Sequence, residues 1–312
     1  MGRGGRPSRG GPACVVLPHA VADGARNMAL DESMLEYAAA GRTLLRFYGW
    51  DPWCVSLGRN QPAPARLLGK APGDIRPGVD AVRRPTGGRS VFHGPEITYA
   101  FACPDRAWGG PKAVLRSLHR ALAEGLRALG VPVDDLPRDD APTPGTAGPI
   151  ALSAAACFRE PAPGELTVGG RKLVGSAQRR RRGALLQHGS ILLEDRQKLA
   201  DLDGPEALAD PAADPVGEAG GRPSIGLGEA LSPAPDAETI IRRLEAGMAR
   251  AFGAPAPPGD IVGVSATLDR MAASYEGLHR SAAWLWRREQ RAVARRRAPS
   301  PLDPSASRLT VP

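Results

Sequence analysis

Apolar residues recur every three or four positions in three stretches of the chain, and this spacing predicts amphipathic helices. The clearest stretch covers residues 112–130, where leucine and valine fall at helical intervals. A second helix is expected over residues 23–41, because Asp23 is a residue type that caps helix N-termini and a glycine ends the pattern. A third follows over residues 236–252, and a basic helix is expected around residues 265–297.

Short runs rich in β-branched and aromatic residues predict strands between these helices. In chain order they are ACVVL, TLLRFYGW, WCVSLGR, VDAVRRP, RSVFHG, EITYAFACP and ALLQHGSILLE. The stretch ELTVGGRKLVGSAQ is expected to form a hairpin that turns at Gly169 and Gly170. Strands mixed with a few helices predict an α+β fold, with mixed β-sheets flanked by helices.

Changes in composition divide the chain into segments. Residues 1–12 and 299–312 are expected to be disordered, and residues 13–255 to form the main domain. A helical C-terminal extension over residues 256–298 follows that domain. Within the main domain, residues 203–235 are rich in proline, glycine, alanine and aspartate, which indicates an irregular connection.

The charge and cysteine content narrow the classes of protein. A net charge of +8 suits an acidic partner or nucleic acid. Nucleic-acid binding ranks low, because the chain lacks interleaved aromatic and basic residues, a zinc motif and a recognition helix. No run approaches the ~20 apolar residues that cross a membrane, and no signal peptide is evident. The four cysteines form no CxxC pair, so we expect no metal site and a reduced, cytoplasmic protein.

Lysine is rare in this chain, and one of the lysines follows a cysteine at short spacing. Only four of the 41 basic residues are lysine. In ACFREPAPGELTVGGRK, Lys172 comes fifteen positions after Cys157. A nearby ammonium group lowers the pKa of a thiol and favours the thiolate, so the two residues are candidates for a nucleophile and its activating cation. The alternative for Cys157 is a buried structural cysteine.

A second candidate site lies in RRPTGGRSVFHGPEITYAF, residues 83–101. Gly87 and Gly88 lack side chains, so their backbone N–H groups can approach a ligand closely. They are flanked by Arg83, Arg84, Arg89 and His93. The alternative is a glycine turn with solvated arginines.

These stretches together resemble the lipoate-protein ligase and octanoyltransferase family, which shares its catalytic domain with biotin protein ligases. The resemblance rests on RRPTGGRSVFH, GRKLVGSAQ, QHGSILL, NMALDESML and FYGWDPWCVSLGRNQ, and it spans residues 13–255. It implies a biotin/lipoate protein ligase-like fold, a catalytic Lys172 and an acyl pocket. The implied acyl- and substrate-binding residues are Arg84, Thr86, Gly87, Gly88, Arg89, His93, Gly175, Ser176, Ala177, Gln178, His188 and Gly189.

The pair Cys157–Phe158 and the arginine at 89 are more similar to the cysteine-dependent octanoyltransferases than to the ligases. This resemblance implies transfer of an octanoyl group from acyl carrier protein to a lysine of a lipoyl domain, such as that of the glycine cleavage H protein, through an acyl-Cys157 intermediate. A monomer that requires no cofactor is expected. Two alternatives stay open. They are lipoate ligation, which would require ATP and Mg²⁺, and octanoyl amidotransfer between lipoyl domains.

The run of four arginines after GSAQ has two interpretations. A solvated hairpin tip is the ordinary one. Next to the expected site, the run could also attract an acidic carrier protein or lipoyl domain. Its members are Arg179, Arg180, Arg181 and Arg182.

Overall fold

A computed structural model describes residues 13–68, 70–136, 165–202 and 223–287 of the 312-residue chain. In these residues the larger sheet has the strand order β1-β3-β7-β10-β9-β8, and β2 also pairs with β3. Neighbours β3, β7, β10 and β9 are antiparallel, whereas β1 and β2 run parallel to β3. The strands are β1 (Cys14–Val16), β2 (Ala20–Ala22), β3 (Thr43–Trp50), β7 (Glu96–Pro104), β8 (Leu166–Val168), β9 (Arg171–Arg181) and β10 (Ala184–Leu192).

The smaller sheet has the order β5-β4-β6. Its strands are β4 (Trp53–Leu57), β5 (Val79–Arg83) and β6 (Val91–His93), with β4 parallel to β5 and antiparallel to β6. Short 3₁₀ turns occur among the connections of both sheets, namely η1 (Ala65–Leu67), η2 (Pro72–Asp74), η3 (Ala107–Gly109) and η4 (Gln197–Ala200). The predicted α+β fold with mixed sheets flanked by helices is therefore confirmed.

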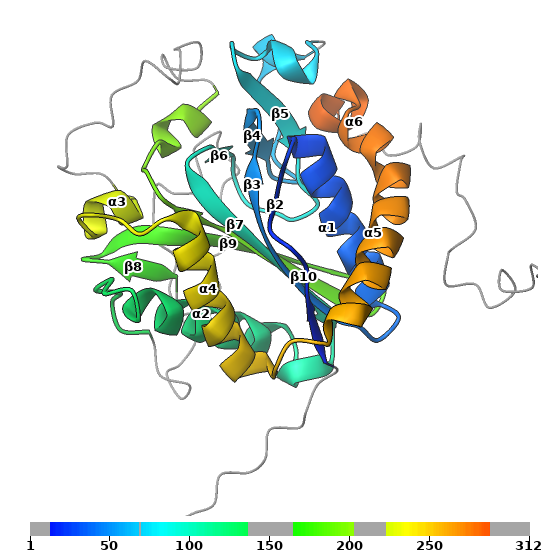
Figure 1. The fold of residues 1–312 in the computed structure, drawn as a ribbon. Helices are drawn as coiled ribbons and strands as arrows, with labels where there is room; N and C mark the ends of the chain where they lie inside the picture. The colour runs from blue at the N-terminus through cyan, green and yellow to red at the C-terminus, as the bar shows by residue number, and fades with distance from the viewer. Residues whose placement is uncertain (1–12, 69, 137–164, 203–222, 288–312) are drawn as a thin grey trace, which may run out of the picture.

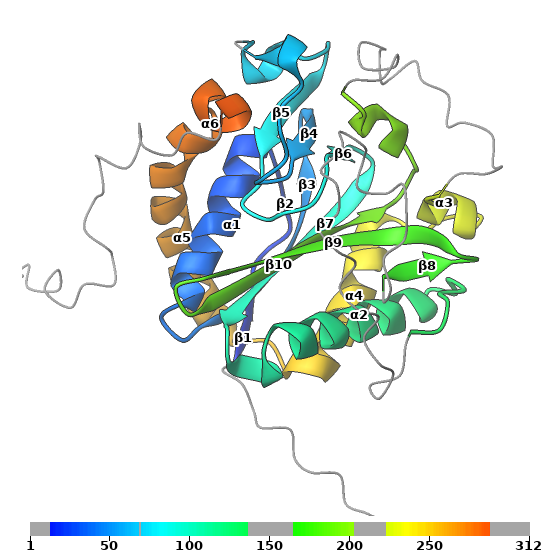
Figure 2. The same ribbon diagram turned by 180° about the vertical axis from the view of Figure 1, so that it is seen from behind.

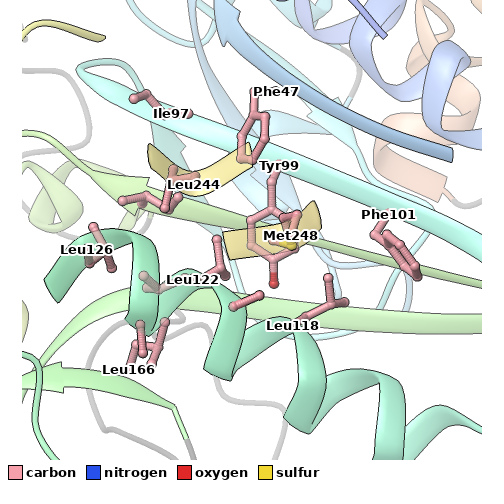
Figure 3. Packing of buried hydrophobic residues seen from close by; sticks show 14 of the residues in the cluster. Phe47, Ile97, Tyr99, Phe101, Leu118, Leu122, Leu126, Leu166, Leu244 and Met248 are labelled. Atoms are coloured by element: carbon pink, nitrogen blue, oxygen red, sulfur yellow. The ribbon is translucent and has the colours of Figure 1, made fainter. Parts of the chain in front are cut away.

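Helices cover both faces of the larger sheet because its central strands are apolar on both sides. Alternate residues of β7 point to opposite faces. Tyr99 and Phe101 pack with Leu118 of α2 (Pro111–Arg127) and Met248 of α4 (Ala237–Phe252) (Figure 3). Ala102 belongs instead to the core formed with α1 (Gly24–Ala38). Figure 1 shows α1 and α2 on opposite sides of the sheet.

The predicted helix starts at Asp23 and Asp236 are confirmed. The Asp23 carboxylate accepts a hydrogen bond from the backbone N–H of Arg26 at 2.8 Å, and Asp236 accepts one from that of Thr239 at 2.7 Å. Each carboxylate satisfies a backbone donor that the first helical turn leaves without a partner. The predicted hairpin turn is also present, since Gly169 and Gly170 both have positive φ between β8 and β9.

The C-terminal helix differs from its predicted bounds of 265–297. Helix α5 spans Pro258–His279, and a separate α6 spans Ala282–Arg287. The helix begins earlier because proline is well suited to the first helical position, where its missing N–H costs nothing. Helix α5 packs along α1, and α6 contacts β5 (Figure 2). Part of the stretch predicted to be irregular also has structure, because α3 spans Leu227–Ala230.

Candidate active site

A pocket lies between the two sheets. From the larger sheet it is lined by Tyr48, Trp50, Thr98 and the β9–β10 pair, and from the smaller by Ser56, Val91 and His93, with Met28 of α1 and the loop residue Arg84. The β9–β10 pair contributes Gly175, Ser176, Ala177, His188, Gly189 and Ser190. The structure thus brings together residues of both predicted motifs, which lie far apart in the sequence.

The loop over residues 84–90, called the glycine-rich loop below, folds around the side chain of Arg84. Its Nη2 donates hydrogen bonds to the carbonyl oxygens of Gly87 at 2.8 Å and Arg89 at 2.6 Å. Its Nη1 donates to the carbonyl oxygen of Ser56 at 3.0 Å. A Cβ atom at Gly58 would lie 1.9 Å from the Gly88 oxygen, so the loop after β4 packs directly on the glycine-rich loop. Arg84 therefore both lines the pocket and sets the shape of its loop.

His188 joins the glycine-rich loop to α1. Its Nε2 lies 2.6 Å from Thr86 Oγ1, and its Nδ1 lies 2.7 Å from Asp31 Oδ2. Burial lowers the pKa of His188, although the Asp31 carboxylate opposes this effect. The ring is therefore held neutral, donating from Nδ1 to Asp31 and accepting at Nε2 from the threonine hydroxyl. His188 supports the pocket by holding Thr86.

The carboxylate of Asp31 is charged despite complete burial. Burial raises its pKa, but Arg46 and His188 together outweigh that effect and lower the pKa below its usual value. Arg46 Nη2 donates to Asp31 Oδ1 at 2.7 Å. Sequence reasoning missed this buried ion pair. The one available signal was an acidic residue on the apolar face of a predicted helix.

His93 has the same arrangement at the other side of the pocket. Its Nδ1 lies 2.8 Å from Glu96 Oε1, and its Nε2 lies 2.7 Å from Ser56 Oγ. The ring stacks on that of Trp50 with 3.9 Å between centroids. Both nitrogens of each pocket histidine are thus hydrogen-bonded within the protein. Neither is placed to act as a general base without losing one of these bonds.

Lys172 lies near the start of β9, on the strand that carries Gly175 to Ala177 into the pocket. The residue is 1% exposed, and its Nζ is 2.7 Å from Glu165 Oε1. Its backbone is held by β8 on one side and on the other by bonds with Pro223 and Ile225. The ammonium group is therefore buried next to a carboxylate, and the backbone of Lys172 is fixed by pairing on both sides.

Cys157 lies outside the described residues, and so does Phe158. Glu165 is the first described residue that follows them. The other three cysteines are buried free thiols. Burial raises the pKa of Cys14 and of Cys103 to about 12, and it raises that of Cys54 well above its usual value. These three are thus held as unreactive thiols.

Ser176 takes part in a hydrogen-bond network that reaches α2. Its Oγ lies 2.8 Å from Tyr99 Oη and 3.0 Å from His119 Nε2. The Gln178 amide donates to the Pro111 carbonyl oxygen at 3.1 Å and to the Gln187 side chain. Sequence reasoning missed His119. A polar residue beside Leu118 on the buried face of an amphipathic helix was the signal for it.

The arginine run divides into two pairs. Arg179 and Arg181 point to α1, where their Nη1 atoms lie 2.6 and 3.0 Å from the two oxygens of Glu32. Arg180 pairs with Asp105 at 2.6 Å but stays exposed, as does Arg182 at the hairpin tip. Two of the four predicted docking residues therefore form ion pairs with the buried carboxylate of Glu32.

In the part of the chain that the structure describes, histidine, cysteine, aspartate and glutamate side chains form no group that could hold a metal ion. The helices described there are all too short or too polar to cross a membrane.

The fold and site place the chain in a known class of protein. Residues 23–248 match the lipoyl protein ligase A/B catalytic domain, and the chain belongs to this family. The expected family is therefore confirmed.

Several relatives carry the name octanoyltransferase LipM. The chain is 36% identical to that of Kyrpidia tusciae over 262 residues, which cover 80% of this chain and 91% of the relative. It is 43% identical to that of Symbiobacterium thermophilum over 176 residues, which cover 55% of this chain and 62% of the relative. The second match thus spans less than two thirds of that relative.

Solved structures share the fold. A bipartite lipoate protein ligase from Thermoplasma acidophilum, studied with its E2 lipoyl domain, has a TM-score of 0.58 at 15% identity, covering 88% of this chain and 96% of that chain. LipL1 of P. falciparum in complex with lipoate has a TM-score of 0.57 at 15% identity, covering 88% and 74%. The predicted ligase-like fold is confirmed.

Proposed function

We propose that this protein is an octanoyltransferase of protein lipoylation, which moves an octanoyl group from acyl carrier protein to a lysine of a lipoyl domain. The observation that carries the proposal is the 36% identity that extends over 91% of the octanoyltransferase LipM of Kyrpidia tusciae. The enzyme is thus an acyltransferase of the lipoyl protein ligase A/B family. The pocket between the sheets is the site for the acyl chain.

The proposed nucleophile is Cys157. Its thiolate attacks the carbonyl carbon of the donor thioester, the bond from that carbon to the donor sulfur breaks, and this sulfur takes up a proton and leaves as a free thiol. The amine of the acceptor lysine then attacks the Cys157 thioester. The amide bond forms as the bond to the Cys157 sulfur breaks, and the proton lost by the amine goes to that sulfur. The burial of the other three cysteines supports this assignment, because each has a raised pKa.

Lys172 is the second proposed catalytic residue. A buried ammonium group stabilises a thiolate and the developing oxyanion, and it can give a proton to the leaving sulfur. Its ion pair with Glu165 supports this role, because the carboxylate stands at the end of the segment that carries Cys157. Arg84 lines the acyl site together with the β9–β10 residues of the pocket. Thr86 and Gly87 support it through their hydrogen bonds with His188 and Arg84.

The transfer requires no cofactor, because the donor thioester already holds the acyl group in an activated form. The acceptor is a lipoyl domain such as that of the glycine cleavage H protein, and the enzyme acts as a monomer in the cytoplasm, where thiols stay reduced. Lipoate ligation with ATP and Mg²⁺, and amidotransfer between lipoyl domains, are the competing reactions.

Incubation with octanoyl-acyl carrier protein, without ATP, tests the proposal. Intact-mass analysis should show an octanoyl adduct on the enzyme that hydroxylamine removes, and added lipoyl domain should take up the group. Octanoylation only from free octanoate with ATP and Mg²⁺ would establish the ligase reaction instead. Donation from an octanoylated lipoyl domain but not from the carrier protein would establish amidotransfer.

A further inference from the structure

Helix α6 reaches the active-site loops although it lies beyond residues 23–248, which match the family. It contacts β5, the strand that ends at Arg83 (Figure 1). Leu285 and Trp286 belong to the core of the smaller sheet. The side chain of Trp284 instead contacts Arg83 at the end of β5.

Arg83 connects α6 to the loop that follows β4. The residue is fully buried. Its Nε donates to the carbonyl oxygens of Leu285 at 2.8 Å and Trp284 at 3.2 Å. Its Nη1 donates to those of Gly58 at 2.5 Å and Gln61 at 2.7 Å. One guanidinium group thus fixes two segments that are more than 200 residues apart in the sequence.

The loop over residues 58–61 in turn holds the glycine-rich loop. The backbone N–H of Arg59 donates to the Thr86 carbonyl oxygen at 2.8 Å, and Gly58 packs against the Gly88 oxygen. Thr86 is the residue whose hydroxyl meets His188 at the pocket. A shift of α6 would therefore be transmitted through Arg83 to the loops around the pocket.

Trp284 completes this connection. Its indole Nε1 donates to the Arg83 carbonyl oxygen at 3.2 Å, and the Arg59 guanidinium lies 5.4 Å from the centre of its ring. The side chain is 1% exposed. Trp284 thus contacts both Arg83 and the loop that Arg83 holds.

We propose that Trp284 and Arg83 are positioning residues of the active site, through which α6 fixes the 58–61 and 86–88 loops in the shape that binds the acyl group. The last point rests on the proposed function, because it assigns the pocket to the octanoyl chain. Loops held by packing and by satisfied hydrogen bonds keep a site near its productive geometry, and small displacements there lower affinity and rate.

Two matched substitutions test the proposal. Trp284→Phe removes an indole N–H bond to a backbone carbonyl and shortens a buried side chain. Trp286→Phe makes the same change on the same helix, because Trp286 Nε1 donates to the Lys70 carbonyl oxygen at 2.7 Å and the side chain is 4% exposed. Trp286 has no contact with Arg83 among the described hydrogen bonds. The control thus removes an equivalent bond while leaving the Arg83 connection in place.

The first readout is independent of activity. Amide hydrogen exchange of the full chain without substrate should be faster in peptides covering 58–61 and 86–88 for Trp284→Phe, and unchanged there for Trp286→Phe. The second readout is kinetic. With octanoyl-coenzyme A as donor, Trp284→Phe should raise KM on the order of ten-fold, and Trp286→Phe should leave it within about two-fold.

Equal exchange in both variants overturns the proposal, and so does faster loop exchange with an unchanged KM and kcat. If Trp284→Phe fails to fold, the variant Arg83→Lys is used instead, with the same measurements of loop exchange and KM. Lysine keeps the charge but cannot span both sets of carbonyl oxygens, so both readouts should change as stated for Trp284→Phe. If the wild type accepts no octanoyl thioester, the proposed function fails, while the exchange result still decides the role of α6 in holding the loops.

Discussion

Thr86 Oγ1 lies 2.6 Å from His188 Nε2, and this contact joins two motifs that are 102 residues apart. The other nitrogen of the same ring lies 2.7 Å from Asp31 Oδ2. One neutral histidine therefore connects the glycine-rich loop, β10 and α1. The pocket depends on this connection, because the loop itself has no regular secondary structure over residues 84–90.

A double-mutant cycle with Thr86→Val and His188→Leu should show that these residues act as a unit. Residues in direct hydrogen-bonded contact typically couple by about 0.5–3 kcal/mol. The free energy of unfolding, measured in urea, should therefore fall less in the double variant than the two single changes add up to. KM for an octanoyl thioester should rise in each variant. Additive effects on stability would show that the contact contributes little in solution.

Most elements of the fold could be predicted from local pattern. The strand TLLRFYGW forms β3 at residues 43–50, and the helix predicted over 236–252 forms α4 at 237–252. The strand is rich in apolar and aromatic residues, and the helix has buried residues at helical spacing and the Asp236 cap. The bounds of α5 could not be predicted, because its first turn is PGD, a sequence typical of loops. Its packing along α1 stabilises the helix there.

The sequence indicated some of the residues at the site but not the contacts between them. Arg84, His93 and His188 line the pocket, whereas Thr86, Gly87, Gly88, Arg89 and Gln178 are not among its lining residues. That any of them binds the acyl group stays a prediction. Their hydrogen-bond partners were hidden, because contacts such as His188 with Asp31 join residues 157 positions apart. The pairing of Glu32 with Arg179 was hidden for the same reason. From the sequence, Arg179 looks like one more solvated arginine.

Cys157→Ala should abolish octanoyl transfer and the hydroxylamine-labile adduct, while the melting temperature stays unchanged within error. Cys14→Ala is the control. Cys14 is buried and its pKa is raised to about 12, so it should keep the adduct even if stability falls. Intact mass after incubation with octanoyl-acyl carrier protein measures both. An adduct that persists in Cys157→Ala would place the nucleophile elsewhere.

Lys172→Arg should be nearly as damaging as Lys172→Ala. The guanidinium keeps the charge but does not release a proton at working pH, and the lysine side chain is 2% exposed, which leaves little space for a larger group. A fall in kcat of at least about 100-fold is expected for both, the scale typical of losing a general acid or base. Single-turnover rates measure it. Substantial activity in Lys172→Arg would reduce the role of Lys172 to a fixed charge.

His279 should make the protein sensitive to acid. Burial lowers its pKa from the usual 6.5 to about 4, despite the opposing influence of Glu32 and Asp31; Arg179 adds to the lowering. Between pH 6.5 and about 4, His279 is protonated in the unfolded chain but stays neutral in the folded protein. Stability is therefore lost as the pH falls through this range. The loss from this residue is on the order of 3 kcal/mol.

Urea unfolding of the wild type and of His279→Gln between pH 7 and pH 4 measures this effect. The variant should lose less stability over that range, even if it is less stable at pH 7. His188 also has a lowered pKa and remains in both proteins, so the difference between the two curves isolates His279. Parallel curves would mean that His279 accepts its proton while folded.

The arginine run should separate into a docking pair and a structural pair. Arg180 and Arg182 are exposed, whereas Arg179 and Arg181 hold Glu32, which is 3% exposed. Replacing Arg180 and Arg182 with serine should raise KM for acyl carrier protein and flatten its dependence on salt. Exposed charges act mainly on the rate at which two proteins meet, and salt screens these charges over ~10 Å at 0.1 M. Because octanoyl-coenzyme A needs no protein docking, its KM should change much less.

The matched double variant Arg179→Ser with Arg181→Ser should behave in the opposite way. It leaves the buried Glu32 carboxylate without these two partners, so the melting temperature should fall. The loss of unfolding free energy should be smaller than the about 3–5 kcal/mol typical of a fully buried ion pair, because the Arg181 side chain is 33% exposed. The salt dependence of carrier binding should change little in whatever fraction remains folded. Equal loss of maximal rate with both donors after Arg180 and Arg182 are replaced would mean that the exposed pair shapes the active site and does not dock the carrier.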